Sequence, residues 1–284
     1  MDKKPSVKLW FRTLAAALLL LASTFATGAN AQTGACFSPI TYAGAGAANG
    51  ITLRTLAFSP FGRAEAGWEI YLPMVQKEIG SRCGPGTAGF SAALARWQAR
   101  ARVKPTGVMD PATFLAIKTA VQLRRPFVLQ SRQACPAPPA AAMLAVGTVK
   151  EGYGGKTPVL RAPALAAYRR MVEAARQEVP SLRTDARMMT IFSSYRSPDY
   201  DAARCARDGN CDGIRRATCS PHRTGYAMDL YLGSAFGFGP DSTADLNRLH
   251  QSRSPAYRWL VANASRFGFA NYPFEPWHWE WIGP

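Results

Sequence analysis

The sequence predicts an α+β fold, a small antiparallel sheet with flanking helices, preceded by a small three-helix domain. Helical and strand patterns alternate in the C-terminal half, whereas the N-terminal half shows three helical stretches. Between them lies "CPAPPAAAM" at 135–143, where prolines remove backbone donors and disfavour regular structure. We therefore expect a Pro/Ala-rich linker over 123–147 and a second domain over 148–284. The chain has 284 residues and is 48% hydrophobic, so each domain can bury a core.

The first 31 residues are typical of a signal peptide. They contain basic residues, an apolar run and a small-residue cleavage pattern, in the order Lys3, Lys4, Lys8, Arg12, then 14–22, then Ala29-Asn30-Ala31. The apolar run is shorter than the roughly 20 residues that span a bilayer. We expect cleavage before Gln32 and an exported chain, periplasmic or secreted and cell-wall associated, with no stable transmembrane anchor. An uncleaved N-terminal anchor is the alternative.

Six cysteines follow this segment: Cys36, Cys83, Cys135, Cys205, Cys211 and Cys219. An exported chain reaches an oxidising compartment, where disulfide formation is the default role of cysteine. Six cysteines allow fifteen pairings, so the connectivity stays open. The close spacing of the last three predicts at least one bridge in the loop ahead of His222. A zinc cluster is the alternative, but the sequence contains no CxxC pair.

The formal net charge is +16, and it stays strongly positive without the predicted signal peptide. Such a surface attracts anionic partners over a long range. An exported chain rarely meets nucleic acid, so we expect an anionic cell-wall polymer or a membrane surface and no nucleic acid. A purely solubilising charge is the alternative, and the oligomeric state is not indicated.

Residues 32–66 form an N-terminal extension, and a helical domain is expected over 67–122. Its helices are predicted from "EIYLPMVQKEIG", "FSAALARWQARARV" and "DPATFLAIKTAV", where apolar residues recur at helical spacing. Ser91 is a candidate cap of the second helix. In the third, Asp110 suits the N-cap and Pro111 the first turn.

The C-terminal half begins with the helical pattern "PALAAYRRMVEAARQEVP", which Pro180 ends. The buried strand "MMTIFSSYRSP" follows, and the next helix is expected to begin at Ser197, so Arg196 lies between strand end and helix start. A further helix is predicted in "SPAYRWLVANASRFGF", with Ser254 as its cap and Gly268 as its stop. A terminal strand completes the small sheet.

The stretch "SPHRTGYAMDLYLG" at 220–233 places a histidine seven residues before an aspartate. Alternation along a strand puts Met228 on the core face and Asp229 on the opposite face, which we expect to border a cleft. His222 can return to that cleft through Gly225, because glycine tolerates the backbone geometry of a tight turn.

The C-terminal stretch "FEPWHWEWIGP" supplies a second histidine and a glutamate three residues before it. A catalytic zinc takes three protein ligands and a water. We expect one Zn²⁺ ion on His222, Asp229 and His278. Glu275 is then left to accept a proton from the water. His250, the third histidine, has no partner motif and is expected to be solvated near a helix end.

These residues resemble the VanY-type zinc D-alanyl-D-alanine carboxypeptidases and dipeptidases. The family motif SxHxxGxAxD is filled here by Ser220, His222, Gly225, Ala227 and Asp229, and ExWHW by Glu275, Trp277, His278 and Trp279. A third motif, "SSYRSP", contains Arg196. The resemblance covers roughly residues 150–284 and implies a hedgehog/DD-peptidase-like fold. One departure is the insertion "AARCARDGNCDGIRRATC", where the family often carries a shorter, Gln-containing stretch that contacts the peptide.

The resemblance also implies roles. Glu275 would be the general base and later the proton donor, and Arg196 would stabilise the oxyanion. Ser220 would help to hold the terminal carboxylate of the substrate, with Tyr195 and Trp277 as pocket walls. In the N-terminal half, "ALARWQ…VKPTGVMDPATFLAI" resembles a three-helix peptidoglycan-binding domain. A generic helical bundle is the alternative there.

The sequence therefore predicts an exported zinc metallopeptidase that hydrolyses stem peptides of peptidoglycan, its expected partner. The first prediction is a D-alanyl-D-alanine carboxypeptidase, and the second is an endopeptidase that acts on interior or cross-link bonds. The alternative from another class is a non-catalytic wall-binding protein with a structural zinc site. The ligands specify the chemistry and leave the cleaved bond open.

Overall fold

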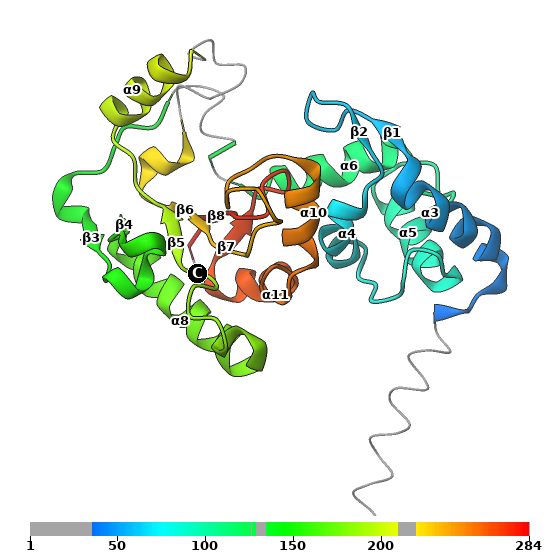
Figure 1. Ribbon diagram of the computed structural model, residues 1–284. Helices are drawn as coiled ribbons and strands as arrows, with labels where there is room; N and C mark the ends of the chain where they lie inside the picture. Colours follow the sequence, from blue (N-terminus) through cyan, green and yellow to red (C-terminus); the bar gives the residue numbers. More distant parts are fainter. Residues whose placement is uncertain (1–35, 126, 129–134, 210–219, 284) are drawn as a thin grey trace, which may run out of the picture. The chain divides into compact units, whose positions relative to one another are not determined.

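The computed structural model describes residues 36–125, 127–128, 135–209 and 220–283 (Figure 1). They form two compact units: the described residues of 1–51 with 81–109, and those of 52–80 with 110–284. The predicted signal peptide lies outside the described residues. Within the described part of the chain, no helix has both the length and the apolarity needed to cross a bilayer.

The first unit is built around a buried asparagine. Its helices are η1 (Ile40–Tyr42), the start of α3 (Ala43–Thr55) and α5 (Ala88–Arg100). Asn49 donates from Nδ2 to Ser91 Oγ and to the Gly107 carbonyl, each at 2.8 Å, and accepts from Met109 N at 2.7 Å. One side chain therefore ties α3 to α5 and to the turn after α5.

The predicted cap of α5 is wrong. The helix begins one turn earlier than its apolar pattern suggested, and Thr87 is the N-cap, accepting a hydrogen bond from Phe90 N at 3.4 Å. Ser91 lies inside the helix, fully buried, where it accepts from Asn49. A serine near a helix start can either cap the helix or lie inside its first turns. Here the hydrogen bond from the distant Asn49 holds Ser91 inside the helix.

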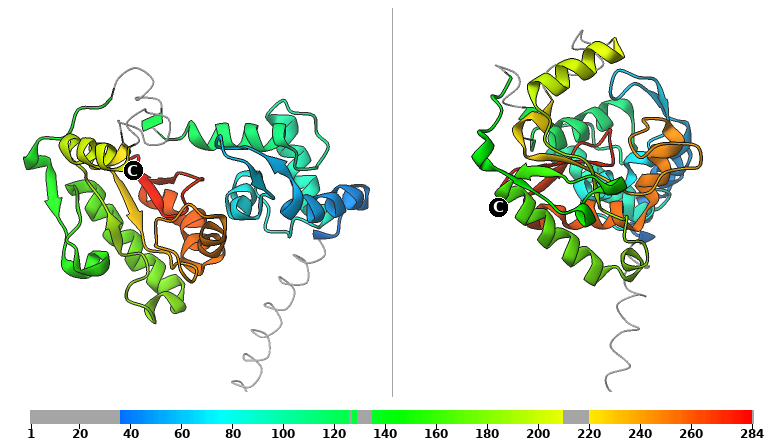
Figure 2. Two further views of the ribbon diagram at one scale, coloured as in Figure 1. Left: turned by 45° about the horizontal axis from the view of Figure 1, so that its top comes forward. Right: turned by 60° about the vertical axis from the view of Figure 1, so that its left-hand side comes forward.

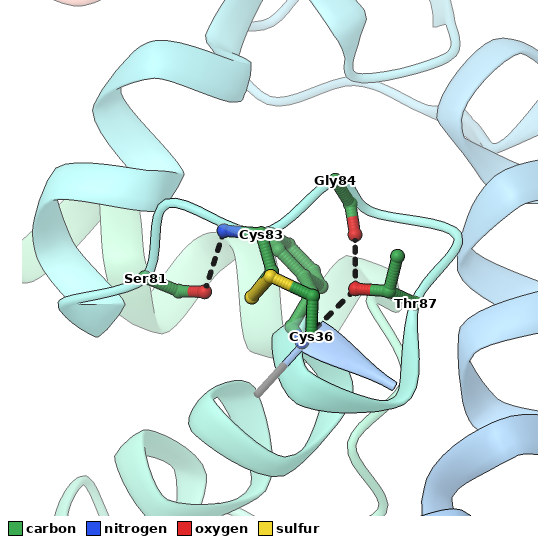
Figure 3. The surroundings of a disulfide bond; sticks show 6 residues. Cys36, Ser81, Cys83, Gly84 and Thr87 are labelled. Atoms are coloured by element: carbon green, nitrogen blue, oxygen red, sulfur yellow. Dashed lines mark hydrogen bonds between the residues drawn. A yellow bond between two sulfur atoms is a disulfide. The ribbon is translucent and has the colours of Figure 1, made fainter. Parts of the chain in front are cut away.

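A disulfide between Cys36 and Cys83 joins the beginning of the described chain to the loop before α5 (Figure 3). Two hydrogen bonds also stabilise that loop (Figure 3). Cys83 N donates to Ser81 Oγ at 3.2 Å, and Thr87 Oγ1 donates to the Gly84 carbonyl at 2.7 Å. Cys135 and Cys205 are also disulfide-bonded. Cys211 and Cys219, and with them the predicted bridge ahead of His222, lie outside the described residues.

Replacing Cys36 and Cys83 by serine together is expected to destabilise the first unit by about 4 kcal/mol, because the bridge closes a separation of 47 residues and restricts the unfolded chain. Denaturant unfolding of the double variant beside the unmodified chain, both under oxidising conditions, measures the change. An unchanged unfolding midpoint would show that the bridge contributes nothing to stability.

The second unit opens with the β1–β2 hairpin and two helices. The elements are β1 (Ala57–Phe58), β2 (Glu65–Ala66), η2 (Glu69–Tyr71), α4 (Leu72–Ile79) and α6 (Pro111–Gln122). Asp110 caps α6 as predicted, accepting from Thr113 N at 2.7 Å. The three predicted helices are therefore present, but α4 and α6 belong to this unit and α5 to the other. The domain boundaries and the peptidoglycan-binding role of this half stay predictions.

The rest of the second unit is the predicted α+β fold. A four-stranded antiparallel sheet has the order β5-β6-β8-β7, made of β5 (Ile191–Ser193), β6 (Ala227–Leu230), β8 (His278–Trp281) and β7 (Phe269–Asn271). A separate hairpin pairs β3 (Leu144–Val146) with β4 (Val159–Arg161). The helices are α8 (Ala162–Glu178), α9 (Pro198–Asp208), α10 (Asp245–Arg253) and α11 (Pro255–Asn263) (Figures 1 and 2).

The strand alternation correctly predicts the core. Met228, Leu230 and Leu232 are fully buried and belong to one hydrophobic core with residues of α8 and α11. The predicted N-caps also hold: Ser197 accepts from Tyr200 N and Ser254 from Tyr257 N. Because one face of β6 is fixed in the core, Asp229 must point to the other face of the sheet.

Candidate metal centre

Three segments bring His222, Asp229 and His278 together. Asp229 is in β6 and His278 opens β8, and the two are direct partners in the antiparallel register, so their side chains share one face. His222 is in η7 (Pro221–Thr224), which ends at Gly225 in a left-handed conformation, φ 73°. That turn leads straight into β6. One ligand atom from each of the three side chains lies within 4.8 Å of the others.

The donor set fits a zinc ion. His222 Nε2 lies 3.2 Å from Asp229 Oδ2, and His278 Nδ1 lies 2.8 Å from Asp229 Oδ1. Ligands at zinc bond lengths of about 2.0–2.2 Å in a tetrahedral site are separated by a similar distance. Asp229 is only 6% exposed, and each of its carboxylate oxygens lies against a nitrogen of one of the two imidazoles.

The outer nitrogen of each ring has a partner that orients it. His222 Nδ1 lies 2.8 Å from the Ser194 carbonyl, and His278 Nε2 lies 3.1 Å from Glu280 Oε1. These contacts leave His222 Nε2 and His278 Nδ1 free to face the centre, the arrangement that metal-binding histidines require. Sequence reasoning missed Glu280, although its position two residues after His278 on the same strand face was a usable signal.

Burial and charge act against each other on the three side chains. Burial lowers the pKa of His222. Burial would raise the pKa of Asp229, but the charges and hydrogen bonds of both histidines outweigh it and hold that pKa well below its usual range. Burial opposes protonation of His278, yet its hydrogen bonds to Asp229 and Glu280 raise its pKa to about 9. Asp229 is therefore an ionised ligand throughout the neutral range.

Glu275 lies in the loop between β7 and β8, one turn before His278. Its backbone is fixed, since Glu275 N donates to the Tyr272 carbonyl and His278 N donates to the Glu275 carbonyl. Within the described residues its carboxylate takes part in no hydrogen bond or ion pair. Burial raises its pKa, and it is close enough to His278 and Asp229 for their charges to act on it. A carboxylate of raised pKa beside the ligands can accept a proton.

Arg196 is held between β5 and α9, as predicted. Its Nη2 donates to Ser220 Oγ at 2.7 Å, its Nη1 donates to Ser193 Oγ at 3.2 Å, and its Nε lies 3.0 Å from Asp201 Oδ1. Arg196 N also donates to the His222 carbonyl at 3.3 Å. This backbone hydrogen bond connects the segment that carries the guanidinium to the segment that carries the candidate ligand His222. Asp201 was missed, because no sequence motif marks it.

The remaining predicted residues differ in burial and in what they contact. Ser220 is buried next to Arg196 and caps η7, so its hydroxyl orients the guanidinium. Tyr195 is partly buried at the end of β5. Trp277 is 2% exposed and belongs to the hydrophobic core, and its place in the pocket wall stays a prediction. His250 is exposed near the end of α10, as expected.

One family model matches the part of the chain that holds this site. Residues 157–284 match the family model described as VanY, D-alanyl-D-alanine carboxypeptidase. Among solved structures, the chain is similar to a mutant of the vancomycin-resistance D,D-pentapeptidase VanY from the VanB-type resistance cassette, in complex with Zn(II), at 19% identity and a TM-score of 0.31. That comparison covers 54% of this chain and 85% of the other. The chain has no match among curated proteins. The segment that matches this family model, residues 157–284, holds His222, Asp229 and His278 together with Glu275 and Arg196.

Proposed function

We propose that this protein is an exported zinc peptidase that removes the terminal D-alanine from the stem peptide of peptidoglycan. The observation that carries the proposal is the buried group of His222, Asp229 and His278 with the unpaired carboxylate of Glu275 beside it. The basic, apolar N-terminus and the disulfide-bonded cysteines support export. The match of residues 157–284 to the family model described as D-alanyl-D-alanine carboxypeptidase supports a peptidoglycan stem peptide as the substrate.

The residues divide the chemistry among them. A zinc ion held by His222, Asp229 and His278 would lower the pKa of a water molecule to about 7 and would polarise a carbonyl group. Glu275 accepts the proton of the water as its oxygen attacks the scissile carbonyl carbon. When the C–N bond breaks, Glu275 returns that proton to the amine of the departing D-alanine.

Arg196 stabilises the negative charge that develops on the carbonyl oxygen. A guanidinium has five N–H donors, and its contacts to Ser193 and Ser220 use one from each terminal nitrogen. Each terminal nitrogen therefore keeps one N–H for the substrate. The ion pair of Arg196 Nε with Asp201 further orients the guanidinium, so these donors are in place before substrate binds.

A purely structural zinc site, the alternative from the binding-protein class, fits less well. A structural site closes its fourth position with a protein ligand. Here only three of the described residues group as ligands, and the carboxylate of Glu275 is not one of them. The endopeptidase alternative uses the same residues and differs only in the bond that is cut.

The direct test is mass spectrometry of pentapeptide muropeptides after incubation with the zinc-loaded mature chain. We expect the loss of one terminal alanine. His222→Ala should abolish the reaction, whereas His250→Ala, which changes the exposed third histidine, should leave it intact. Cleavage at an interior bond would replace the carboxypeptidase with the endopeptidase, and intact peptides with every variant would refute the proposed activity.

A further inference from the structure

Arg125 is a buried cation from outside the family-matched residues. It follows α6, and within the second unit it is only 5% exposed. Its Nε donates to Glu280 Oε1 at 3.1 Å, and its Nη2 makes a second, shorter contact with the same oxygen. Its Nη1 donates to Gln122 Oε1 at 2.5 Å, and its guanidinium lies over the ring of Tyr272, 4.4 Å from the centroid. Four contacts therefore fix the direction of this side chain.

Glu280 connects this arginine to the metal centre. The same Oε1 that receives Arg125 lies 3.1 Å from His278 Nε2, and Glu280 is 4% exposed. Its Oε2 has no hydrogen-bond partner among the described residues. A buried carboxylate needs a cation or several donors to remain in place. Arg125 is the only arginine or lysine with which Glu280 forms an ion pair in the described part of the chain.

We propose that Arg125 is a positioning residue for the metal centre: by holding Glu280, it fixes the ring of His278 with Nδ1 toward Asp229. The inference rests on the proposed zinc function and extends it beyond the family domain. The centre would then be completed by a residue that lies 155 positions before Glu280 in the chain. The segment that ends in α6 would support the ligand set as well as its own fold.

The chain offers a matched control in the neighbouring arginine. Arg124 is 56% exposed and pairs through Nη1 with Glu78 Oε2 at 2.7 Å, away from the ligands. Arg125→Met and Arg124→Met therefore remove the same charge from adjacent positions. Only the first removes the cation that holds Glu280.

The experiment measures the zinc dissociation constant of the full mature chain by competition with a chromophoric chelator. We expect Arg125→Met to weaken zinc binding by about 10–100-fold, the usual effect of losing an outer-sphere contact, and Arg124→Met to leave it unchanged. With Co²⁺ in place of zinc, the visible absorption spectrum should change in Arg125→Met only. A thermal melt of the metal-free proteins separates these effects from loss of fold.

A rescue variant tests the route through Glu280. Adding Glu280→Gln to Arg125→Met keeps an oxygen that can accept from His278 Nε2 and removes the charge that Arg125 balanced. It should recover most of the lost zinc affinity. If Arg125→Met does not fold, Arg125→Lys, which keeps the charge without the fork, should bind zinc with intermediate affinity.

Equal zinc affinity and equal cobalt spectra in Arg125→Met and the unmodified chain would overturn the inference while leaving the proposed function intact. So would a double variant that binds zinc no better than Arg125→Met. An unmodified chain that binds no zinc would refute the proposed function first and the inference with it.

Discussion

Glu275→Gln is expected to lower kcat on a pentapeptide stem by about 10²–10⁴-fold, the usual contribution of a general base. Glutamine has nearly the same shape but cannot accept the proton of the attacking water. The three ligands are untouched, so the zinc content should stay at one ion per chain. Steady-state kinetics of D-alanine release, with metal analysis of the same sample, measures both quantities.

Glu275→Asp provides the control, since it keeps a carboxylate and shortens its reach. Its activity should lie between those of the unmodified chain and Glu275→Gln. Full activity in Glu275→Gln with zinc bound would mean that another group transfers the proton, and Glu275 would lose its assigned role.

His222→Ala is expected to abolish zinc binding and activity together. Even the loss of an outer-sphere partner costs 10–100-fold in metal affinity, so removal of a ligand from a three-ligand site should cost more than about 100-fold. A ligand that binds only the native state raises its stability in proportion to the logarithm of its concentration. Added zinc should therefore raise the Tm of the unmodified chain and leave the Tm of His222→Ala unchanged.

His250→Ala is the matched comparison, because His250 is exposed and far from any ligand role. It should respond to zinc like the unmodified chain. A zinc-dependent rise in Tm that survives in His222→Ala would place the stabilising metal elsewhere in the protein.

The metal ligands could be predicted because two local signals converge. Histidine is rare in this chain, and strand alternation around Asp229 fixes which side chain leaves the core. The direct pairing of Asp229 with His278 was not predictable in this way, because alternation along one strand does not determine its register against another. Ser197, Ser254 and Asp110 were predictable as caps, since each acts on its own helix.

Other residues could not be predicted, because their role depends on distant partners. Glu280 and Asp201 are charged side chains whose partners lie in other elements, and no spacing rule links Arg125 to Glu280. For helix α10 only an end near His250 was predicted, because its buried face is polar: Asn247, Arg248 and Gln251 are buried where apolar residues are expected. The core packing of Trp277 was not predicted either, since the motif indicated only that it lies next to His278.

The register of β6 against β8 has a consequence for how the protein matures. Asp229 and His278 are direct partners, yet 49 residues separate them in the chain. Closing so long a loop costs entropy before any contact forms, so non-local pairing of this kind comes late in folding. We expect the nascent chain to cross the membrane with its ligands still apart. Zinc capture would then be a post-translocation event, set by the metal supply of the compartment in which the sheet closes.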